Sequence, residues 1–205
     1  MKPLARFKTT TPPLLIALLL ACFGLAPVAQ AAGPDTDGSI PGSNNGEGIG
    51  VLLNRTTGVW NTGTGFEALN HLTAGNQNTA TGLRALTNDI NGGFNTATGV
   101  LSLFSNTSGF FNSATGAYSL ANNTTGIDNT ANGYGALYFN IDGHDNTATG
   151  FGALYHNTTG DYNTAIGVNA LASNTTAISN TANGAAALQF NTVGGLNTAI
   201  GAQAL

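Results

Sequence analysis

Residues 146–162 read NTATGFGALYHNTTGDY, and residues 163–179 repeat the pattern as NTAIGVNALASNTTAIS. The same 17-residue unit begins at Asn44 and recurs without insertion or deletion as far as Leu205. We number its positions 1 to 17 from the leading asparagine. Position 1 is Asn, position 5 is Gly and position 9 is Leu in every unit. A fixed short period of this kind indicates that each unit forms one coil of a solenoid.

Each unit is predicted to be a β coil rather than a helical or disordered segment. A 17-residue unit is too short for two packed helices, and its Asn, Thr and Gly content disfavours helix. Disorder is disfavoured because a disordered chain has no reason to keep a leucine at one fixed interval. The sequence therefore predicts an all-β parallel solenoid (a β-roll or β-helix) of about nine and a half coils. At ~4.8 Å per coil, the rod would be roughly 45 Å long.

The repeat also predicts where side chains point. Positions 1 to 4 form a strand, with the small residue of position 3 inward and the threonines of positions 2 and 4 outward. The glycine of position 5 forms a corner, the apolar residue of position 6 fills the interior, and positions 12 to 15 form a turn. Position 8 has a small residue and position 9 has leucine. One of these two side chains is expected to face the core, and the other a second buried surface, such as a subunit interface.

Position 1 is expected to form an asparagine ladder in which each side chain bonds the next coil. The residues predicted to form the structural ladders are Asn78, Asn95, Asn112, Asn129, Asn146, Asn163, Gly82, Gly99, Gly116, Leu86, Leu103, Leu120, Leu137 and Leu154.

The N-terminal part of the chain has the pattern of an export signal. Residues 1–31 combine a basic start, an apolar stretch and the small residues Ala29-Gln30-Ala31, so they are predicted to be a signal peptide cleaved before Ala32. A retained membrane helix and lipoprotein processing at Cys22 are the alternatives. Residues 32–43 are predicted to be a flexible linker, and residues 44–205 the solenoid domain.

Charge and cysteine content restrict the partners and the compartment. From residue 32 onward the chain has two arginines, no lysine and nine acidic residues, so its net charge is 2 − 9 = −7. This balance disfavours nucleic acid and anionic lipid as partners. Cys22 is the only cysteine, so the exported chain is expected to depend on stacking and hydrogen bonds rather than on disulfides. No membrane span is expected in the mature chain.

Two five-residue cores, Asn163-Thr164-Ala165-Ile166-Gly167 and Asn197-Thr198-Ala199-Ile200-Gly201, resemble the head repeats of YadA-like trimeric autotransporter adhesins. They are also similar to repeats of phage tail fibres and other surface fibres. The resemblance covers about residues 44–205, although the period of 17 is longer than is usual in that family. It implies a left-handed parallel β-roll, a trimer, and an adhesive role on the bacterial cell surface.

The outward threonines suggest a second function. The Thr-x-Thr pairs Thr79/Thr81, Thr96/Thr98 and Thr147/Thr149 are expected to form a regular array resembling the ice-binding face of β-solenoid antifreeze proteins. The simpler interpretation is that threonine favours strands and solubilises a surface. An ice- or ligand-binding face is therefore a hypothesis alongside a structural role.

The remaining candidate groups favour structure over catalysis. His71 and His156 share position 11 but lie five coils apart, so they cannot form one site. Asp128, Asp142, Asp145, Asp161 and His144 gather near one edge, where a Ca²⁺ site competes with a solvated turn as the interpretation. The ring pairs Phe94/Phe111 and Tyr138/Tyr155 are expected to stack, either as packing or as a recognition surface for a host protein or glycan.

We therefore expect an exported structural or adhesive surface protein, not an enzyme, with no cofactor and no metal. Its expected partner is itself, as a trimer or as an end-to-end filament. The last unit ends nine residues in, and residues 36–43 supply the missing eight, so the N-terminal tail of one copy is suited to complete the open coil of the next. A β-helical polysaccharide enzyme is the least favoured alternative, because Glu47, Glu67 and Asp89 occupy different positions of the unit.

Overall fold

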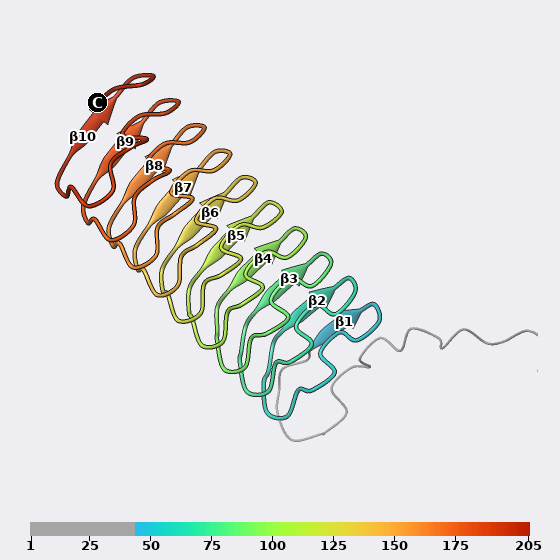
Figure 1. Ribbon diagram of the computed structural model, residues 1–205. Coiled ribbons are helices and arrows are strands. Elements are labelled where there is room, and N and C mark those ends of the chain that lie inside the picture. The colour runs from blue at the N-terminus through green and yellow to red at the C-terminus, as the bar shows by residue number, and fades with distance from the viewer. Residues whose placement is uncertain (1–43) are drawn as a thin grey trace, which may run out of the picture.

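The computed structural model describes residues 44–205, so the predicted signal peptide (1–31) and linker (32–43) lie outside the described residues. The described chain is an all-β solenoid whose ten short strands pair in parallel and in sequence order (Figure 1). The strands are β1 (Asn45–Glu47), β2 (Thr62–Thr64), β3 (Thr79–Thr81), β4 (Thr96–Thr98), β5 (Ser113–Thr115), β6 (Thr130–Asn132), β7 (Thr147–Thr149), β8 (Thr164–Ile166), β9 (Thr181–Asn183) and β10 (Thr198–Ile200). The predicted fold class is confirmed.

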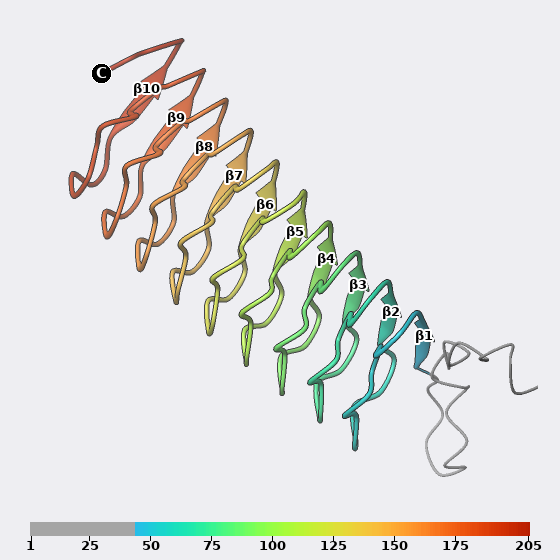
Figure 2. The same ribbon diagram turned by 45° about the vertical axis from the view of Figure 1, so that its right-hand side comes forward.

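One 17-residue unit is one coil, and we number the coils from residues 44–60 (coil 1) to residues 197–205 (coil 10). Figure 2 shows the coils following the same path one after another along a common axis. Like positions therefore lie over one another, as in Thr79 opposite Thr96 and Ala97 opposite Ala114. Within residues 44–205 we find no helix that is long and apolar enough to cross a membrane.

The strand positions follow the predicted alternation. In β4, Ala97 is buried while Thr96 and Thr98 are exposed, and each strand buries its central residue in the same way. Side chains alternate across a strand, so one small inward residue between two polar outward ones is what a half-buried three-residue strand requires. The inward orientation of position 3 and the outward orientation of the threonines are confirmed.

Two columns of buried asparagines hold the coils together. At position 1, Asn129 accepts the backbone N–H of Asn146 on its Oδ1 at 3.1 Å, and its Nδ2 donates to the carbonyl of Gly143 at 2.7 Å. At position 12, Nδ2 of Asn140 donates to Oδ1 of Asn123 at 2.8 Å and also to Gly143 at 3.0 Å. Both columns thus meet at the carbonyl of position 15. The predicted position 1 ladder is confirmed, because these buried amides find their partners in their own and adjacent coils.

The core consists of the alanines of positions 3 and 8 and the leucines of position 9. Ala136 and Leu137 are both fully buried in a single chain. The prediction that one of these two positions faces a second chain is wrong. The reason is a backbone conformation that breaks the strand alternation: the leucines of position 9 have φ between 49° and 59°. In this left-handed region, adjacent side chains no longer point to opposite sides.

A second expectation fails at position 6. Phe66, Val100 and Phe151 are exposed by 43%, 39% and 55%, whereas an interior position was predicted. The glycine of position 5 turns the chain with φ between 120° and 141°, and this corner sends the next side chain outward. An added Cβ on Gly116 would lie 2.7 Å from the carbonyl oxygen of Gly133, so this corner also has no room for a side chain.

Candidate functional site

The outward side of the ten strands presents the predicted threonine rows. Thr79, Thr81, Thr96 and Thr98 are exposed, and the register places them in two adjacent rows. Thr147 and Thr149 of β7 are half-exposed. The second row is interrupted, at position 4, by Asn132, Ile166, Asn183 and Ile200. The structure thus assembles the candidate face over β2 to β4 and again at β7, with a break between them.

A row of apolar side chains runs beside this face, at position 6. We call it the position 6 ridge. Its members are 39–55% exposed and are Ile49, Phe66, Leu83, Val100, Tyr134, Phe151 and Val168. Coil 5 has the smaller Ala117 at this position. Neighbouring members lie one coil apart, and the rings of Tyr134 and Phe151 stack with centroids 5.4 Å apart. An extended apolar row on the surface of a folded chain is a typical mark of an interaction surface.

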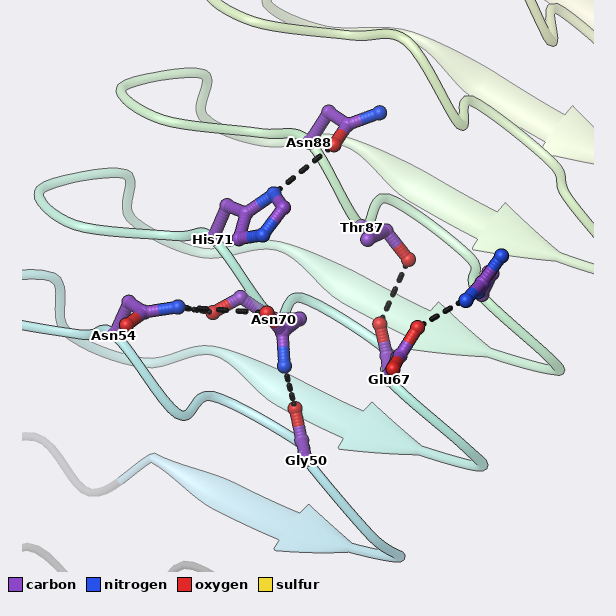
Figure 3. A network of polar contacts seen from close by, with 8 residues as sticks. Gly50, Asn54, Glu67, Asn70, His71, Thr87 and Asn88 are labelled. Carbon is purple, nitrogen blue, oxygen red and sulfur yellow. Dashed lines mark hydrogen bonds and ion pairs between the residues drawn. The ribbon is translucent and has the colours of Figure 1, made fainter.

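A polar hollow of about 330 Å³ lies on coils 2 to 4, on the wall formed by positions 7, 10 and 11. Figure 3 shows the polar side chains of this wall. Its lining residues are Glu67, Asn70, His71, Arg84, Thr87, Asn88 and Phe104. A second hollow of about 490 Å³ adjoins it and shares His71 and Asn88. Of these residues, sequence reasoning weighed Glu67 only as a carboxylate that could not share a cleft with Glu47 and Asp89, and His71 only as one of two separate histidines.

The side chains of the polar hollow are fixed by hydrogen bonds between coils. Nε of Arg84 donates to Oε2 of Glu67 at 2.7 Å. The hydroxyl of Thr87 donates to the carbonyl of Glu67 at 2.7 Å, and Nδ2 of Asn70 donates to the carbonyl of Gly50 at 2.7 Å. Figure 3 shows these contacts connecting three successive coils. The polar groups are therefore held in place before any ligand arrives.

His71 lies at the junction of the two hollows. Its Nδ1 is 3.0 Å from Oδ1 of Asn88, one coil further along. An amide oxygen can only accept, so the hydrogen of this contact is on Nδ1. In the neutral ring, Nε2 is then left as an acceptor. His156, the other histidine of position 11, stacks on Phe139 with centroids 5.4 Å apart and takes no part in the hollow.

Aromatic rings pack along the rod in two groups, one on coils 3 and 4 and a larger one on coils 5 to 7. Tyr138 and Tyr155 stack with centroids 5.1 Å apart and an interplanar angle of 7°, which confirms that predicted pair. Phe94 and Phe111 also stack, at 4.9 Å. In each pair one face of each ring is covered by the ring one coil away. These pairs therefore contribute packing along the rod. Phe94 and Phe111 are nevertheless 45% and 54% exposed, so a recognition role for these rings stays a prediction.

The acidic edge shows no convergent carboxylates within residues 44–205. Asp161 accepts the backbone N–H of His144 at 2.7 Å, and Nδ1 of His144 accepts the N–H of Ile127 at 3.0 Å. These contacts satisfy turn backbone, as the solvated-turn interpretation expects. In the part of the chain that the structure describes, no three His, Cys, Asp or Glu side chains are placed to hold a metal ion.

One acid is buried in the position 12 column. Asp89 occupies position 12, where the later coils have asparagine, and it is fully buried. Its Oδ1 accepts from the N–H of Gly92 at 2.9 Å and from Nδ2 of Asn106 at 3.1 Å, whereas its Oδ2 has no partner among the described residues. Burial raises the pKa of this carboxyl from 3.8 to about 7, against the lowering effect of those hydrogen bonds.

Comparison of the chain with protein-family models, with curated proteins and with solved structures finds no match. The candidate surfaces of the described chain are the Thr rows, the position 6 ridge and the polar hollow.

Proposed function

We propose that this chain is an exported structural protein of the cell surface, whose rods associate side by side and present an adhesive or fibre-forming surface. The observation that carries the proposal is the position 6 ridge. Its exposed apolar residues occupy seven of the first eight coils, on a rod fixed by two internal asparagine columns. Removing such a row from water stabilises an assembly by roughly 25 cal/mol for each Å² of apolar surface covered.

A second copy of the chain is the partner that fits this ridge best. The ridge repeats once per coil, at ~4.8 Å, and the same ridge on a parallel copy has the identical spacing. Apolar side chains of one rod can then pack between those of the other along the whole contact. Three rods around a common axis would cover all the ridges, so a parallel trimer is the assembly that we propose, with the end-to-end filament as its alternative.

Light scattering after size-exclusion chromatography tests this proposal. The wild-type chain is expected to elute as a trimer, and the triple variant Phe66→Ser, Val100→Ser and Phe151→Ser as a monomer. The matched control replaces the exposed apolar residues Ile141, Ile178 and Phe190 by serine. These residues lie outside the ridge, so this variant is expected to stay trimeric. A wild-type chain that is monomeric at every concentration, or a ridge variant with unchanged mass, would refute lateral association.

Export is proposed from the N-terminal sequence alone. Expression of the full chain in a bacterial host, followed by N-terminal sequencing of the extracellular or surface fraction, is expected to give a first residue of Ala32. Retention of residues 1–31 would contradict a cleaved signal peptide, and a lipid-modified N-terminus at Cys22 would favour the lipoprotein route.

Ice binding is a second candidate function, and the threonine register favours it. Thr62/Thr64, Thr79/Thr81 and Thr96/Thr98 form an uninterrupted outward array on three adjacent strands. Its spacing is ~4.8 Å along the rod and roughly 6.7 Å across it. Thermal hysteresis of the purified chain, lost in Thr81→Tyr, is the expected result. If ice growth and crystal shape are unchanged by the wild-type protein, this candidate is excluded.

A further inference from the structure

The coils that carry the polar hollow depart from the repeat more than the fold requires. At position 7, coils 2 and 3 have Glu67 and Arg84, whereas the other coils have Gly, Leu, Tyr, Asn, Ala or Gln. At position 12, the same coils have Leu72 and Asp89 in place of the asparagine of the later ladder. The solenoid forms equally well without these residues, as the later coils show. Local breaks of an otherwise consistent pattern are expected at functional sites.

The lining of the hollow offers donors and acceptors in balance. Glu67 and Nε2 of His71, when the ring is neutral, supply acceptors, and Arg84, whose side chain is 47% exposed, supplies donors. Asn88 can do both, whereas the hydroxyl hydrogen of Thr87 is taken by the carbonyl of Glu67 and leaves only its oxygen as an acceptor. The charges of Arg84 and Glu67 offset each other at 2.7 Å, so the hollow has no excess charge to attract an ion. This combination suits a neutral ligand rich in hydroxyl groups.

The shape of the hollow and its apolar wall restrict the class of ligand further. Phe104 provides an apolar wall beside the polar groups, which matches the two-sided character of a sugar ring, with hydroxyls at its rim and C–H groups on its face. A volume of about 330 Å³ lies at the small end of the usual range for ligand pockets. The adjoining hollow, of about 490 Å³, continues from His71 and Asn88 towards Thr73 and Thr107 and has room for a second ring.

We propose that the polar hollow binds a neutral saccharide, with one pyranose ring between Arg84, Glu67 and Phe104, and a second ring beyond His71. Arg84 and Asn88 donate to ring hydroxyls, Glu67 and Nε2 of His71 accept from them, and Phe104 covers the C–H face. This site is separate from the position 6 ridge and does not depend on lateral association. It would give an exported rod a ligand that is abundant on cell surfaces.

Nuclear magnetic resonance titration of the ¹⁵N-labelled chain tests the proposal, with glucose, galactose, mannose, N-acetylglucosamine and maltose as probes. At least one neutral sugar is expected to bind with a Kd of about 1–10 mM, which is typical of a small open site. The shifted amides are expected in residues 67–71, 84–88 and 104. A disaccharide is expected to extend the shifts to residues 73 and 107. Glucosamine and glucose 6-phosphate serve as charged probes and are expected to bind more weakly.

Matched variants separate this site from a general effect on the rod. Arg84→Ala and Phe104→Ala are each expected to weaken binding by about tenfold or more. Their controls change the same positions in distant coils, Asn169→Ala at position 7 and Tyr155→Ala at position 10, and are expected to leave binding unchanged. His71→Ala, which removes the acceptor Nε2, is also expected to weaken binding, and His156→Ala at the same position of coil 7 is its control.

The proposal is overturned if no neutral sugar shifts these amides at up to about 50 mM, since the affinity would then be below any useful level. It is also overturned if a charged probe binds more tightly than its neutral counterpart, or if the control variants weaken binding as much as the variants of the hollow. A monomeric chain that still binds sugar would refute lateral association and leave the saccharide site standing.

Discussion

Asn106 donates its side-chain amide to Oδ1 of Asp89 at 3.1 Å, and Asn123 makes the same contact with Asn106 at 3.0 Å. In Asn106, Nδ2 also donates to the carbonyl of Gly109 at 3.3 Å. The matching atom of Asp89 is Oδ2, which has no partner within residues 44–205. A carboxyl group that keeps its proton can imitate asparagine here, whereas a carboxylate brings a buried and only half-satisfied charge into the column.

Stability is therefore expected to decrease as pH rises. Asp89 binds its proton with a pKa of about 7 in the folded chain and 3.8 in the unfolded chain. Between these two pH values the folded state therefore binds one more proton than the unfolded state. The contribution of Asp89 to stability is highest below about pH 4 and decreases until the pH exceeds 7. The total loss from this one group is about 4 kcal/mol, at about 1.4 kcal/mol for each pKa unit. Urea unfolding at pH 5 and pH 8 measures the difference.

The variant Asp89→Asn isolates the cause. It is expected to remove most of this pH dependence and to stabilise the chain at pH 8 by about 2–4 kcal/mol, because an amide can donate where a carboxylate cannot. Asp142→Asn, on the exposed acidic edge, is the control and is expected to change little. If Asp89→Asn unfolds at the same urea concentration as wild type at both pH values, Asp89 is not held protonated by the fold.

At position 9, glycine is expected to be at least as well tolerated as alanine, which reverses the usual order of stability for these two substitutions. Leu120 is fully buried with φ of 50°. Leu120→Ala is expected to cost about 2–5 kcal/mol through lost packing. Leu120→Gly loses one more carbon but relieves the left-handed backbone, so we expect it to be no worse than alanine, and better by up to about 1 kcal/mol. Thermal and urea unfolding of both variants decide this, and a glycine variant clearly less stable than the alanine variant would contradict the left-handed conformation.

The glycines of position 5 and those of position 15 are expected to differ in how well they tolerate substitution by alanine. Gly116 has φ of +125° and a backbone carbonyl 2.7 Å from any added Cβ, so Gly116→Ala is expected to cost about 3–5 kcal/mol, from strain and overpacking together. Gly126, at position 15, is crowded but does not have a left-handed φ, and coil 8 already has Ala177 there. Gly126→Ala is expected to cost about 1–3 kcal/mol, from overpacking alone. Equal losses of stability in the two variants would contradict this distinction.

Most of the fold follows from the repeat. Residues that recur at a fixed interval can all be buried and hydrogen-bonded in the same way only if the coils stack on one another. The burial of Asn129 and Ala97 follows directly from that rule. The expectations that fail do so because of backbone conformation. Nothing in the residue type of Leu137 indicates a positive φ, and without it strict alternation wrongly sends one residue of the Ala136–Leu137 pair outward. Phe66 is expected inside because it is apolar, but the corner at the preceding glycine turns its side chain outward.

The polar hollow is harder to predict from the sequence. The repeat identifies the residues that all coils share, whereas the hollow is formed by residues that only a few coils have. The pairing of Glu67 with Arg84 is consistent with their 17-residue separation, and the break at Asp89 is visible as a missing asparagine. What the sequence does not supply is the direction of positions 7, 10 and 11, which depends on the left-handed residues between them.

The most direct test of the whole account is a set of distances along the rod. Pairs of spin labels on cysteines replacing outward threonines, in a Cys22→Ser background and diluted with unlabelled chain, are measured by double electron–electron resonance. The pairs are 79/147, 79/181 and 62/198, which are four, six and eight coils apart. Distances near ~19, ~29 and ~38 Å, increasing by about 4.8 Å for every coil, are the predicted result. Distances that fail to increase linearly with the number of coils would show that the 17-residue unit does not wind once around a common axis.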